Sequence, residues 1–255
     1  MNRDTIIHRL DPRTKIVLLI VYIVALFQAV SWWSYALVLA VTVLTMALGH
    51  ISPKNIFKGL KPMLFIIVLT ALLNIFYTQG TPIVEGWIVT WEGIGRSVQM
   101  ILRIVLLIAG TFLLTYTTSP LALTDGLEKL MSPLKRIGVP VHEMTLMMSM
   151  ALRFIPTLIE ETDKIMSAQR ARGADFETGS LINRAKALIP VLVPLFVSSF
   201  RRADDLAVAM ECRCYHGGEG RTRMKQLHFT AADRIALLLG VLFLAGVIAL
   251  KKFGV

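Results

Sequence analysis

Five long apolar blocks constrain the fold of this chain more than any other feature of its sequence. Each approaches the ~20 residues that cross the hydrocarbon core of a bilayer, and interfacial flanking residues extend it. A segment in lipid must satisfy its own backbone hydrogen bonds, which favours helices. We therefore predict an all-α membrane protein with about five transmembrane helices. The blocks cover Ile16–Ser31, Trp32–Gly49, Met63–Thr78, Val98–Tyr116 and Ile235–Leu250.

The distribution of Lys and Arg predicts the orientation of these spans. The 255-residue chain has 27 Lys and Arg against 17 Asp and Glu, a net charge of +10. Segments 1–15 and 50–62 are basic, and the positive-inside rule places such segments in the cytoplasm. Residues 80–95 hold acids and no Lys or Arg, so we expect an outer connection there, with a short hairpin near Glu85.

The same basic residues exclude two other interpretations. They are not interleaved with aromatic residues on one face, so we expect a lipid bilayer and no nucleic acid as partner. The charged segment 1–15 is not followed by a short apolar core with a small-residue cleavage site, so we predict no removable signal peptide.

The long section 119–228 predicts a cytoplasmic, interfacial arm of three coupling helices. A short amphipathic helix covers Leu121–Leu134, and two long helices cover 140–172 and Leu181–Arg213. Each long helix measures about 50 Å at ~1.5 Å per residue, and runs from an apolar half to a charged end. We expect a membrane domain at 1–118, the coupling arm at 119–228 and a final transmembrane helix at 229–255.

Each long helix of the arm ends on an arginine between small residues. These tips read Ala171-Arg172-Gly173 and Cys212-Arg213-Cys214. A cation at a helix C-terminus offsets the dipole, and glycine is a common C-terminal cap, so either arginine alone is ordinary. The repeated pattern favours docking, because small neighbours let a guanidinium enter a narrow groove and bind carboxylates with two donors.

The first long helix begins with four methionines. Such a stripe most often packs in a core, but methionine is also enriched on surfaces that accept several partners. We expect an interface of this second kind. The residues are Met144, Met147, Met148 and Met150.

Catalytic motifs are missing from the sequence. It contains no phosphate-binding Gly-x-x-x-x-Gly-Lys-Ser/Thr loop. Cys212, Cys214, His216 and His228 do not follow a familiar zinc spacing. Arg103 is the one charge within a span, and we expect it to bond to backbone carbonyls or reach the outer headgroups. We predict a non-catalytic subunit that holds no cofactor and no metal.

Both arginine tips, together with the opening His8-Arg9-Leu10-Asp11-Pro12-Arg13-Thr14-Lys15 and the run Gly217–Thr222, resemble the transmembrane (T) component of bacterial energy-coupling factor (ECF) transporters. The likeness spans essentially the whole chain. Cys212 and Cys214 are a departure, since that family usually has alanine and glycine or serine there.

The resemblance implies a function in coupling. Such a protein joins two cytoplasmic ATPase subunits to a membrane-embedded, substrate-binding S component of a vitamin or metal-ion importer in the cell membrane. It implies that Arg172 and Arg213 each dock to one ATPase. We add the hypothesis that the four methionines meet the S component, or several exchanged S components.

Two alternatives belong to other classes. A stand-alone secondary transporter needs a binding site near the bilayer midplane, and the spans offer only Arg103. A conventional ABC permease would share the coupling helices but bind the substrate itself. Transport by the purified chain alone favours the first, and substrate binding to the isolated chain favours the second.

Overall fold

The computed structural model describes residues 5–78, 80–81, 90–178, 180–217 and 227–252. Within these ranges the chain consists of helices joined by turns, which confirms the predicted all-α class. The hairpin expected near Glu85 and residues 218–222 of the run after the second tip lie outside the described residues. The chain forms two compact units. Unit 1 comprises Met1–Leu130 and Gln226–Val255, and unit 2 comprises Met131–Lys225.

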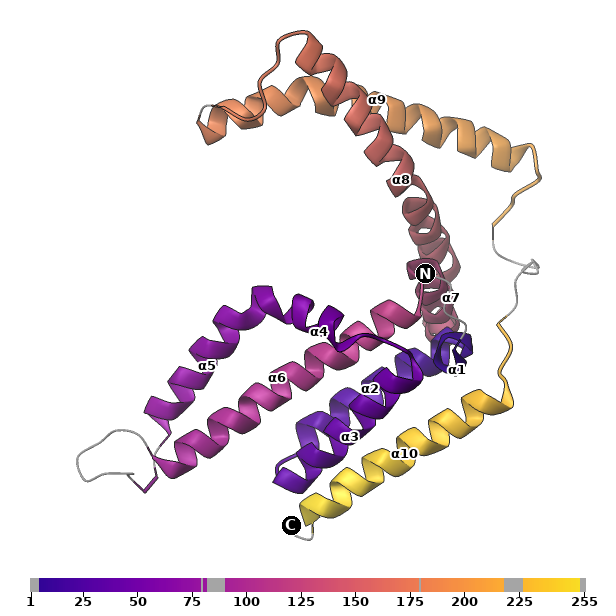
Figure 1. Ribbon diagram of the computed structural model, residues 1–255. Coiled ribbons are helices and arrows are strands. Elements are labelled where there is room, and N and C mark those ends of the chain that lie inside the picture. Colours follow the sequence, from indigo (N-terminus) through magenta and orange to yellow (C-terminus); the bar gives the residue numbers. More distant parts are fainter. Residues whose placement is uncertain (1–4, 79, 82–89, 179, 218–226, 253–255) are drawn as a thin grey trace. The chain divides into compact units, whose positions relative to one another are not determined.

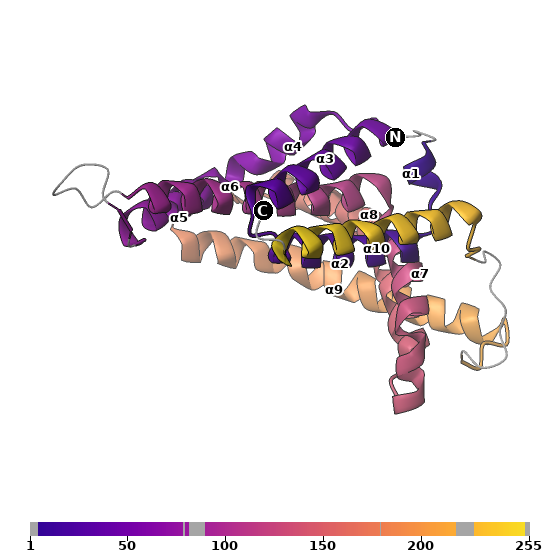
Figure 2. The same ribbon diagram turned by 90° about the horizontal axis from the view of Figure 1, so that it is seen from below.

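Unit 1 contains the apolar helices. Helices α2, α3, α6 and α10 lie side by side, and α5 packs on α6 (Figures 1 and 2). The elements are α1 (Ile6–Arg9), α2 (Pro12–Gln28), α3 (Trp32–Leu48), α4 (Pro53–Leu60), η1 (Lys61–Met63), α5 (Leu64–Tyr77), α6 (Trp91–Thr117), α7 (Pro120–Met131) and α10 (Ala231–Lys252).

Three of the five expected spans are long and apolar enough to cross a membrane. They are the nearly continuous helix Ile56–Tyr77, α6 and α10. Helices α2 and α3 have 17 residues each, about one turn short of a span. Among the described residues a fourth helix meets the same criterion, Ile182–Glu211, which belongs to the predicted arm.

The core of unit 1 is built on small residues that let helices approach closely. Ala25 of α2 and its C-cap residue Ala29 are fully buried, together with Val38 of α3 and Val247 of α10. A Cβ on Gly110 of α6 would lie 2.5 Å from the ring of Tyr22, which leaves room only for glycine. Helices in lipid associate through this kind of close packing.

Polar side chains join the same helices across the core. The Tyr22 hydroxyl donates to the Leu106 carbonyl at 2.9 Å and lies 2.9 Å from the Thr42 hydroxyl. These bonds link α2, α6 and α3. Arg103 of α6 donates to the Ala29 carbonyl at 3.0 Å, at the end of α2. The charge within the spans is therefore bonded to a backbone carbonyl, one of the two outcomes expected for it.

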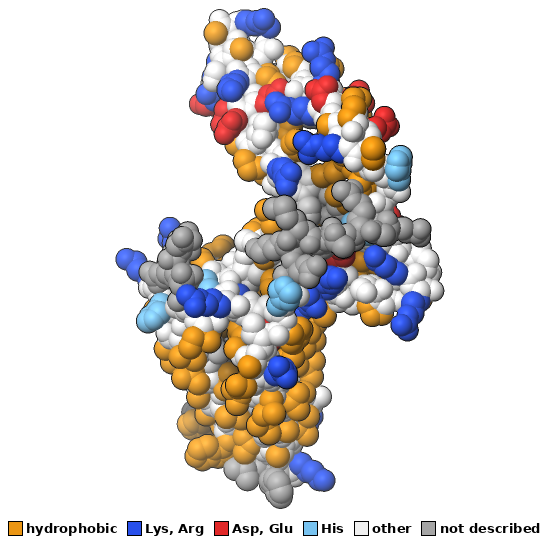
Figure 3. Space-filling model, turned by 90° about the vertical axis from the view of Figure 1, so that its right-hand side faces the viewer, with side chains coloured by type: hydrophobic (Ala, Val, Ile, Leu, Met, Phe, Trp, Pro, Cys, Tyr) orange, Lys and Arg blue, Asp and Glu red, His pale blue; other side chains and the backbone are white. Residues whose placement is uncertain are grey.

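Hydrophobic side chains cover the flank of unit 1. The face shown in Figure 3 carries a broad apolar band over this unit, in which charged side chains are sparse. Many large apolar residues are at least half exposed, among them Ile20, Phe65, Val43 and Leu239. An exposed surface of this composition is stable against lipid chains and costly in water. Unit 1 is therefore a membrane-embedded helical bundle.

Unit 2 consists of η2 (Ser132–Ile137) and two helices of 31 residues, α8 (Val141–Ala171) and α9 (Leu181–Glu211). The two long helices contact each other and cross (Figure 1). Their observed bounds agree with the predicted 140–172 and Leu181–Arg213 to within two residues.

Candidate docking sites at the ends of two crossed helices

The end of α8 is a Schellman turn that presents Arg172. Gly173 has a φ of +89°, in the left-handed region. Its amide donates to the Arg170 carbonyl at 2.9 Å, and the Ala174 amide donates to the Gln169 carbonyl at 3.0 Å. These are the two bonds of the motif, and they satisfy carbonyls that the helix leaves unpaired. Arg172 stands immediately before the left-handed residue.

The end of α9 repeats this geometry around Arg213. Cys214 has a φ of +55° and takes the place of Gly173. Its amide donates to the Glu211 carbonyl at 2.8 Å, and the Tyr215 amide donates to the Met210 carbonyl at 3.0 Å. Arg172 and Arg213 therefore occupy equivalent positions in two copies of one turn, although a cysteine with a Cβ atom adopts a conformation that favours glycine.

Side-chain contacts distinguish Arg172 and Arg213 from nearby Arg170. Arg170 lies 3.6 Å from the Glu177 carboxylate and 6.0 Å from the centroid of the Phe176 ring. Within the described ranges, the side chains of Arg172 and Arg213 make no hydrogen bond or ion pair. Both residues are exposed, and so are their neighbours Ala171, Gly173, Cys212 and Cys214. Two fork-shaped donors are thus exposed at hydrogen-bonded turns.

The loop after Arg172 is held by an aspartate. Asp175 accepts hydrogen bonds from the Thr178 hydroxyl and from the amides of Glu177, at 2.9 Å, and Thr178, at 3.1 Å. The Thr178 bond, followed by the two amide bonds, lowers the pKa of Asp175 to about 2. The carboxylate stays ionised at neutral pH, and it fixes the connection between the two long helices.

A polar cluster fixes the crossing of α8 and α9. Arg202 of α9 donates to the Glu161 carboxylate at 2.7 Å, and the Ser198 hydroxyl donates to its other oxygen. The Ser198 bond is the main reason that the pKa of Glu161 lies below its usual value, and the bond to Arg202 adds to it. Glu161 gives no local signal in the sequence, because its partners lie 37 and 41 residues further along the chain.

A second bond across the crossing depends on proline. Pro194 has no amide hydrogen, so the Pro190 carbonyl four residues earlier loses its helical partner. The side-chain amide of Gln169 donates to that carbonyl at 3.3 Å. The two contacts, Glu161 with Ser198 and Gln169 with Pro190, run in opposite directions along the two helices, so the helices cross antiparallel.

The crossing separates the two arginines. Its centre lies near Ile165 of α8 and Pro194 of α9, midway between the two bonds. At ~1.5 Å per residue, Arg172 lies about 10 Å beyond the centre and Arg213 about 28 Å beyond it, on the opposite side. The two tips are therefore roughly 30–40 Å apart, too far to enter a single groove.

The methionines of α8 lie mainly on an exposed apolar face. The side chains of Met144, Met147 and Met148 are 41%, 61% and 47% exposed. Met150, at the edge of that face, is less exposed and half-buried. Ile155 and Ile159 continue the face at helical spacing and are also exposed. Three of the four residues thus do not pack in a core within this chain.

Helix α9 carries a similar apolar stripe along its first half. The residues of this stripe are three, four or seven positions apart, and each is more than half exposed. The polar residues gather in the second half, before Arg213. The stripe consists of Ile182, Ile189, Val193, Phe196 and Phe200.

The two cysteines of the second tip raise the question of metal coordination. Among the residues that the structure describes, no group of three or more His, Cys, Asp or Glu side chains is placed to hold a metal ion. Cys212 and Cys214 are exposed thiols without a disulfide. Both side chains are small, and Cys214 is the left-handed residue of the turn.

Fold and site together define a helical membrane protein with a two-helix arm that presents paired arginines. Comparison with known proteins identifies the family. Residues 3–224 match the model of the CbiQ family, described as cobalt transport protein, so the chain belongs to that family. This confirms the resemblance drawn from the sequence motifs.

Named relatives match over most of both chains and share one description. The chain is 51% identical over 251 residues to the energy-coupling factor transporter transmembrane protein EcfT of Ruminiclostridium cellulolyticum, an alignment that covers 97% of this chain and 94% of that protein. It is 54% identical over 237 residues to EcfT of Thermosediminibacter oceani, covering 92% and 89%. Identity to EcfT of Bacillus subtilis is 48% over 232 residues, covering 90% and 88%.

Proposed function

We propose that this chain is the coupling subunit of an ATP-driven ECF-type importer of micronutrients. In this role it joins two cytoplasmic ATPase subunits to a membrane-embedded S component that binds the substrate, and it passes ATP-driven motion to that component. The name of its relatives, transmembrane protein of an energy-coupling factor transporter, supports this role. The arm and the N-terminus then face the cytoplasm of a bacterial cell.

One observation carries the proposal: two exposed arginines repeat a single turn geometry at tips 30–40 Å apart. Each guanidinium is available for a carboxylate in a partner, and the separation suits two partners. Arg172 with Ala171 and Gly173 would enter one ATPase, and Arg213 with Cys212 and Cys214 the other.

The apolar faces of the arm suit a second interface. Met144, Met147 and Met148, with Met150 at the edge, form an unbranched and adaptable surface. We assign this face to the S component, and its plasticity suits exchange of several S components. ATP-driven closure of the ATPases would move the two tips, and the crossed helices would transmit that motion to this face.

The experiment compares arginine variants in the assembled complex. Arg172→Ala, Arg213→Ala and the double variant are co-expressed with both ATPases and an S component. Loss of one partner of a desolvated charge pair costs ~2–5 kcal/mol, so each single variant should bind the ATPases about 30-fold or more weakly. The double variant should not assemble or transport.

Arg170→Ala is the matched control. It removes the same charge two residues from Arg172, but its guanidinium already contacts Glu177 and Phe176. ATPase binding should stay within about twofold of the unchanged protein, because an exposed ion pair contributes little. Full transport by the double variant, or an equal loss in the Arg170 variant, would refute the proposed docking.

A further inference from the structure

Unit 2 (Met131–Lys225), called the arm from here on, is an insertion in the membrane-embedded unit, so it has two covalent roots. The chain leaves unit 1 after α7, at Leu130, and returns to it at Gln226. The described part of the return consists of Leu227 to Thr230, followed by α10. Any force on the arm that travels along the chain must pass through α7 or through this returning segment.

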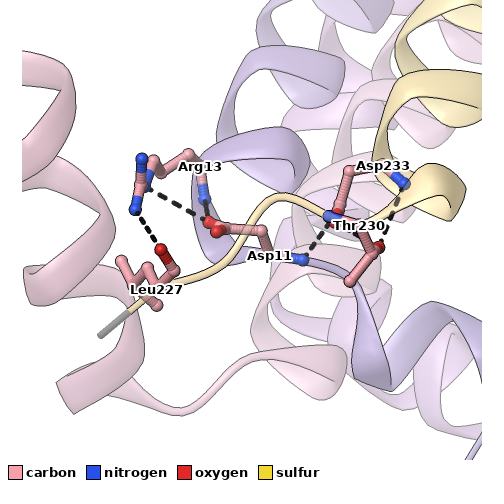
Figure 4. A network of polar contacts seen from close by, with 5 residues as sticks. All are labelled: Asp11, Arg13, Leu227, Thr230 and Asp233. Carbon is pink, nitrogen blue, oxygen red and sulfur yellow. Dashed lines mark hydrogen bonds and ion pairs between the residues drawn. The ribbon is translucent and has the colours of Figure 1, made fainter. Parts of the chain in front are cut away.

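The start of α2 contacts the returning segment (Figure 4). The Arg13 guanidinium donates to the Leu227 carbonyl at 3.1 Å and lies 5.9 Å from the centroid of the Phe229 ring. Asp233 accepts from the Thr230 amide at 2.9 Å and from the Thr230 hydroxyl at 2.6 Å. These contacts hold the segment from both of its ends.

Asp233 also ties the segment to α2. Its second oxygen accepts from the backbone amide of Asp11 at 2.8 Å, across 222 residues of sequence. Asp11 is itself the N-terminal cap of α2, and its carboxylate accepts from the Arg13 amide at 2.9 Å. The Asp233 carboxylate thus closes the first turn of α10 and holds the first turn of α2 beside it.

The same turn of α2 contacts the other root. The Lys15 ammonium donates to the carbonyl of Thr117, the last residue of α6, at 2.9 Å, just before α7 begins. Gly126 of α7 lies directly against α2, since a Cβ there would be 3.1 Å from Pro12 and 3.3 Å from Ile16. The two roots of the arm therefore meet on either side of a single helical turn.

Burial makes this arrangement rigid. Asp11, Lys15 and Asp233 are 5%, 7% and 0% exposed. Two carboxylates balance the charges of Arg13 and Lys15, so the cluster is neutral as a whole. Separating the members of this cluster would leave buried charges uncompensated, which penalises partial opening.

We propose that the first turn of α2, Asp11 to Lys15, is a clamp that holds both roots of the arm to the membrane-embedded helices. Within the clamp, Arg13 positions the returning segment. With the clamp closed, motion of the arm moves α2 and α10 rather than only bending the returning segment. The inference rests on the proposed coupling function, and it adds to that function a site away from the docking tips.

The test measures the substrate transported per ATP hydrolysed, in proteoliposomes that contain the whole complex. Arg13→Gln removes the fork that binds Leu227 and faces Phe229. We expect assembly and ATP hydrolysis within about twofold of the unchanged complex, and a transport-to-hydrolysis ratio at least fivefold lower. Arg13→Lys, which keeps the charge and part of the contact, should recover part of that ratio.

Lys251→Gln is the matched control. Lys251 of α10 donates to Gln28 of α2 at 2.7 Å, so it is also a cationic link between these two helices, but it lies at their opposite end. The transport-to-hydrolysis ratio of the Lys251→Gln complex should not change. An equal fall in the Lys251 variant would assign the effect to weaker helix packing and overturn the clamp, and so would an unchanged ratio in Arg13→Gln.

A milder variant covers the case in which Arg13→Gln does not assemble. Phe229→Leu removes only the ring beneath the guanidinium from a side chain that is 47% exposed. We expect a ratio about twofold lower, and an unchanged ratio would then overturn the clamp. Transport by the Arg172→Ala/Arg213→Ala double variant would instead refute the proposed function, so the two failures are distinguishable.

Discussion

Replacing Cys214 with glycine should strengthen the turn that presents Arg213. Cys214 has a φ of +55°, where a residue with a Cβ atom is disfavoured by ~1–2 kcal/mol. Glycine removes this strain but loses ~0.4–1 kcal/mol more backbone entropy on folding. The net gain is about 0.5–1 kcal/mol, which lowers the population of the frayed helix end about two- to fivefold.

Hydrogen exchange of two backbone amides measures this change directly. The amides of Cys214 and Tyr215 donate to the Glu211 and Met210 carbonyls at 2.8 and 3.0 Å, and they exchange only when the turn opens. In Cys214→Gly both should exchange about two- to fivefold more slowly after correction for the intrinsic rate of the new sequence.

Two control variants separate backbone strain from loss of the thiol. Cys212 has a φ of −59°, in the right-handed helical region, so Cys212→Ala should leave these rates unchanged. Gly173→Ala imposes the same strain on the first tip, and the amides of residues 173 and 174 should exchange about two- to fivefold faster. Faster exchange in Cys214→Gly, or no change, would show that the left-handed conformation of Cys214 is not strained.

Three further predictions concern the crossing, the spans and the loop. Pro194→Ala restores an amide donor for the Pro190 carbonyl, so Gln169→Ala should destabilise the Pro194→Ala protein less than the unchanged protein. An equal loss of stability from Gln169→Ala in both backgrounds of the double-mutant cycle would contradict this. Arg103→Gln should lower the free energy of unfolding in detergent by ~1.5–3 kcal/mol through loss of the bond to Ala29, whereas Arg96→Gln, at an exposed position, should have little effect. The pKa of Asp175 falls from 3.8 to about 2, so the stabilisation of the loop by its carboxylate is complete above about pH 4 and is lost as the pH falls through 2. Exchange protection of the Glu177 and Thr178 amides should follow that window, and Asp175→Asn should abolish the pH dependence.

The apolar pattern predicted which segments form helices in lipid and where α3 and α5 begin, but it placed the start of the other three too late. Helices α2, α6 and α10 start four to seven residues before their apolar blocks, because polar caps extend them. Asp11 caps the amide of Arg13, and the Thr90 hydroxyl accepts from the Gly93 amide at 3.1 Å. These cap residues are visible in the sequence, and a search for caps would have moved the boundaries correctly.

The arginine tips were accessible from the sequence because each depends on residues within one helical turn. Contacts across the fold were not. The pairing of Glu161 with Ser198 requires the crossing of α8 and α9, and the bond from Asp11 to Asp233 requires α2 and α10 to lie together. The left-handed Cys214 was also missed, because cysteine gives no local signal for that conformation.

The division of the membrane-embedded unit between two distant chain segments affects its biosynthesis. Val247 of α10 is fully buried against the same cluster as Ala25 and Leu26 of α2. A ribosome completes α10 only after the entire arm, so the side of α2 that faces α10 remains in contact with lipid or an insertion factor until then. Asp233, which is buried in the finished bundle, meets the amide of Asp11 at that late stage. Stalling translation within residues 131–225 should therefore yield an inserted but incompletely packed intermediate.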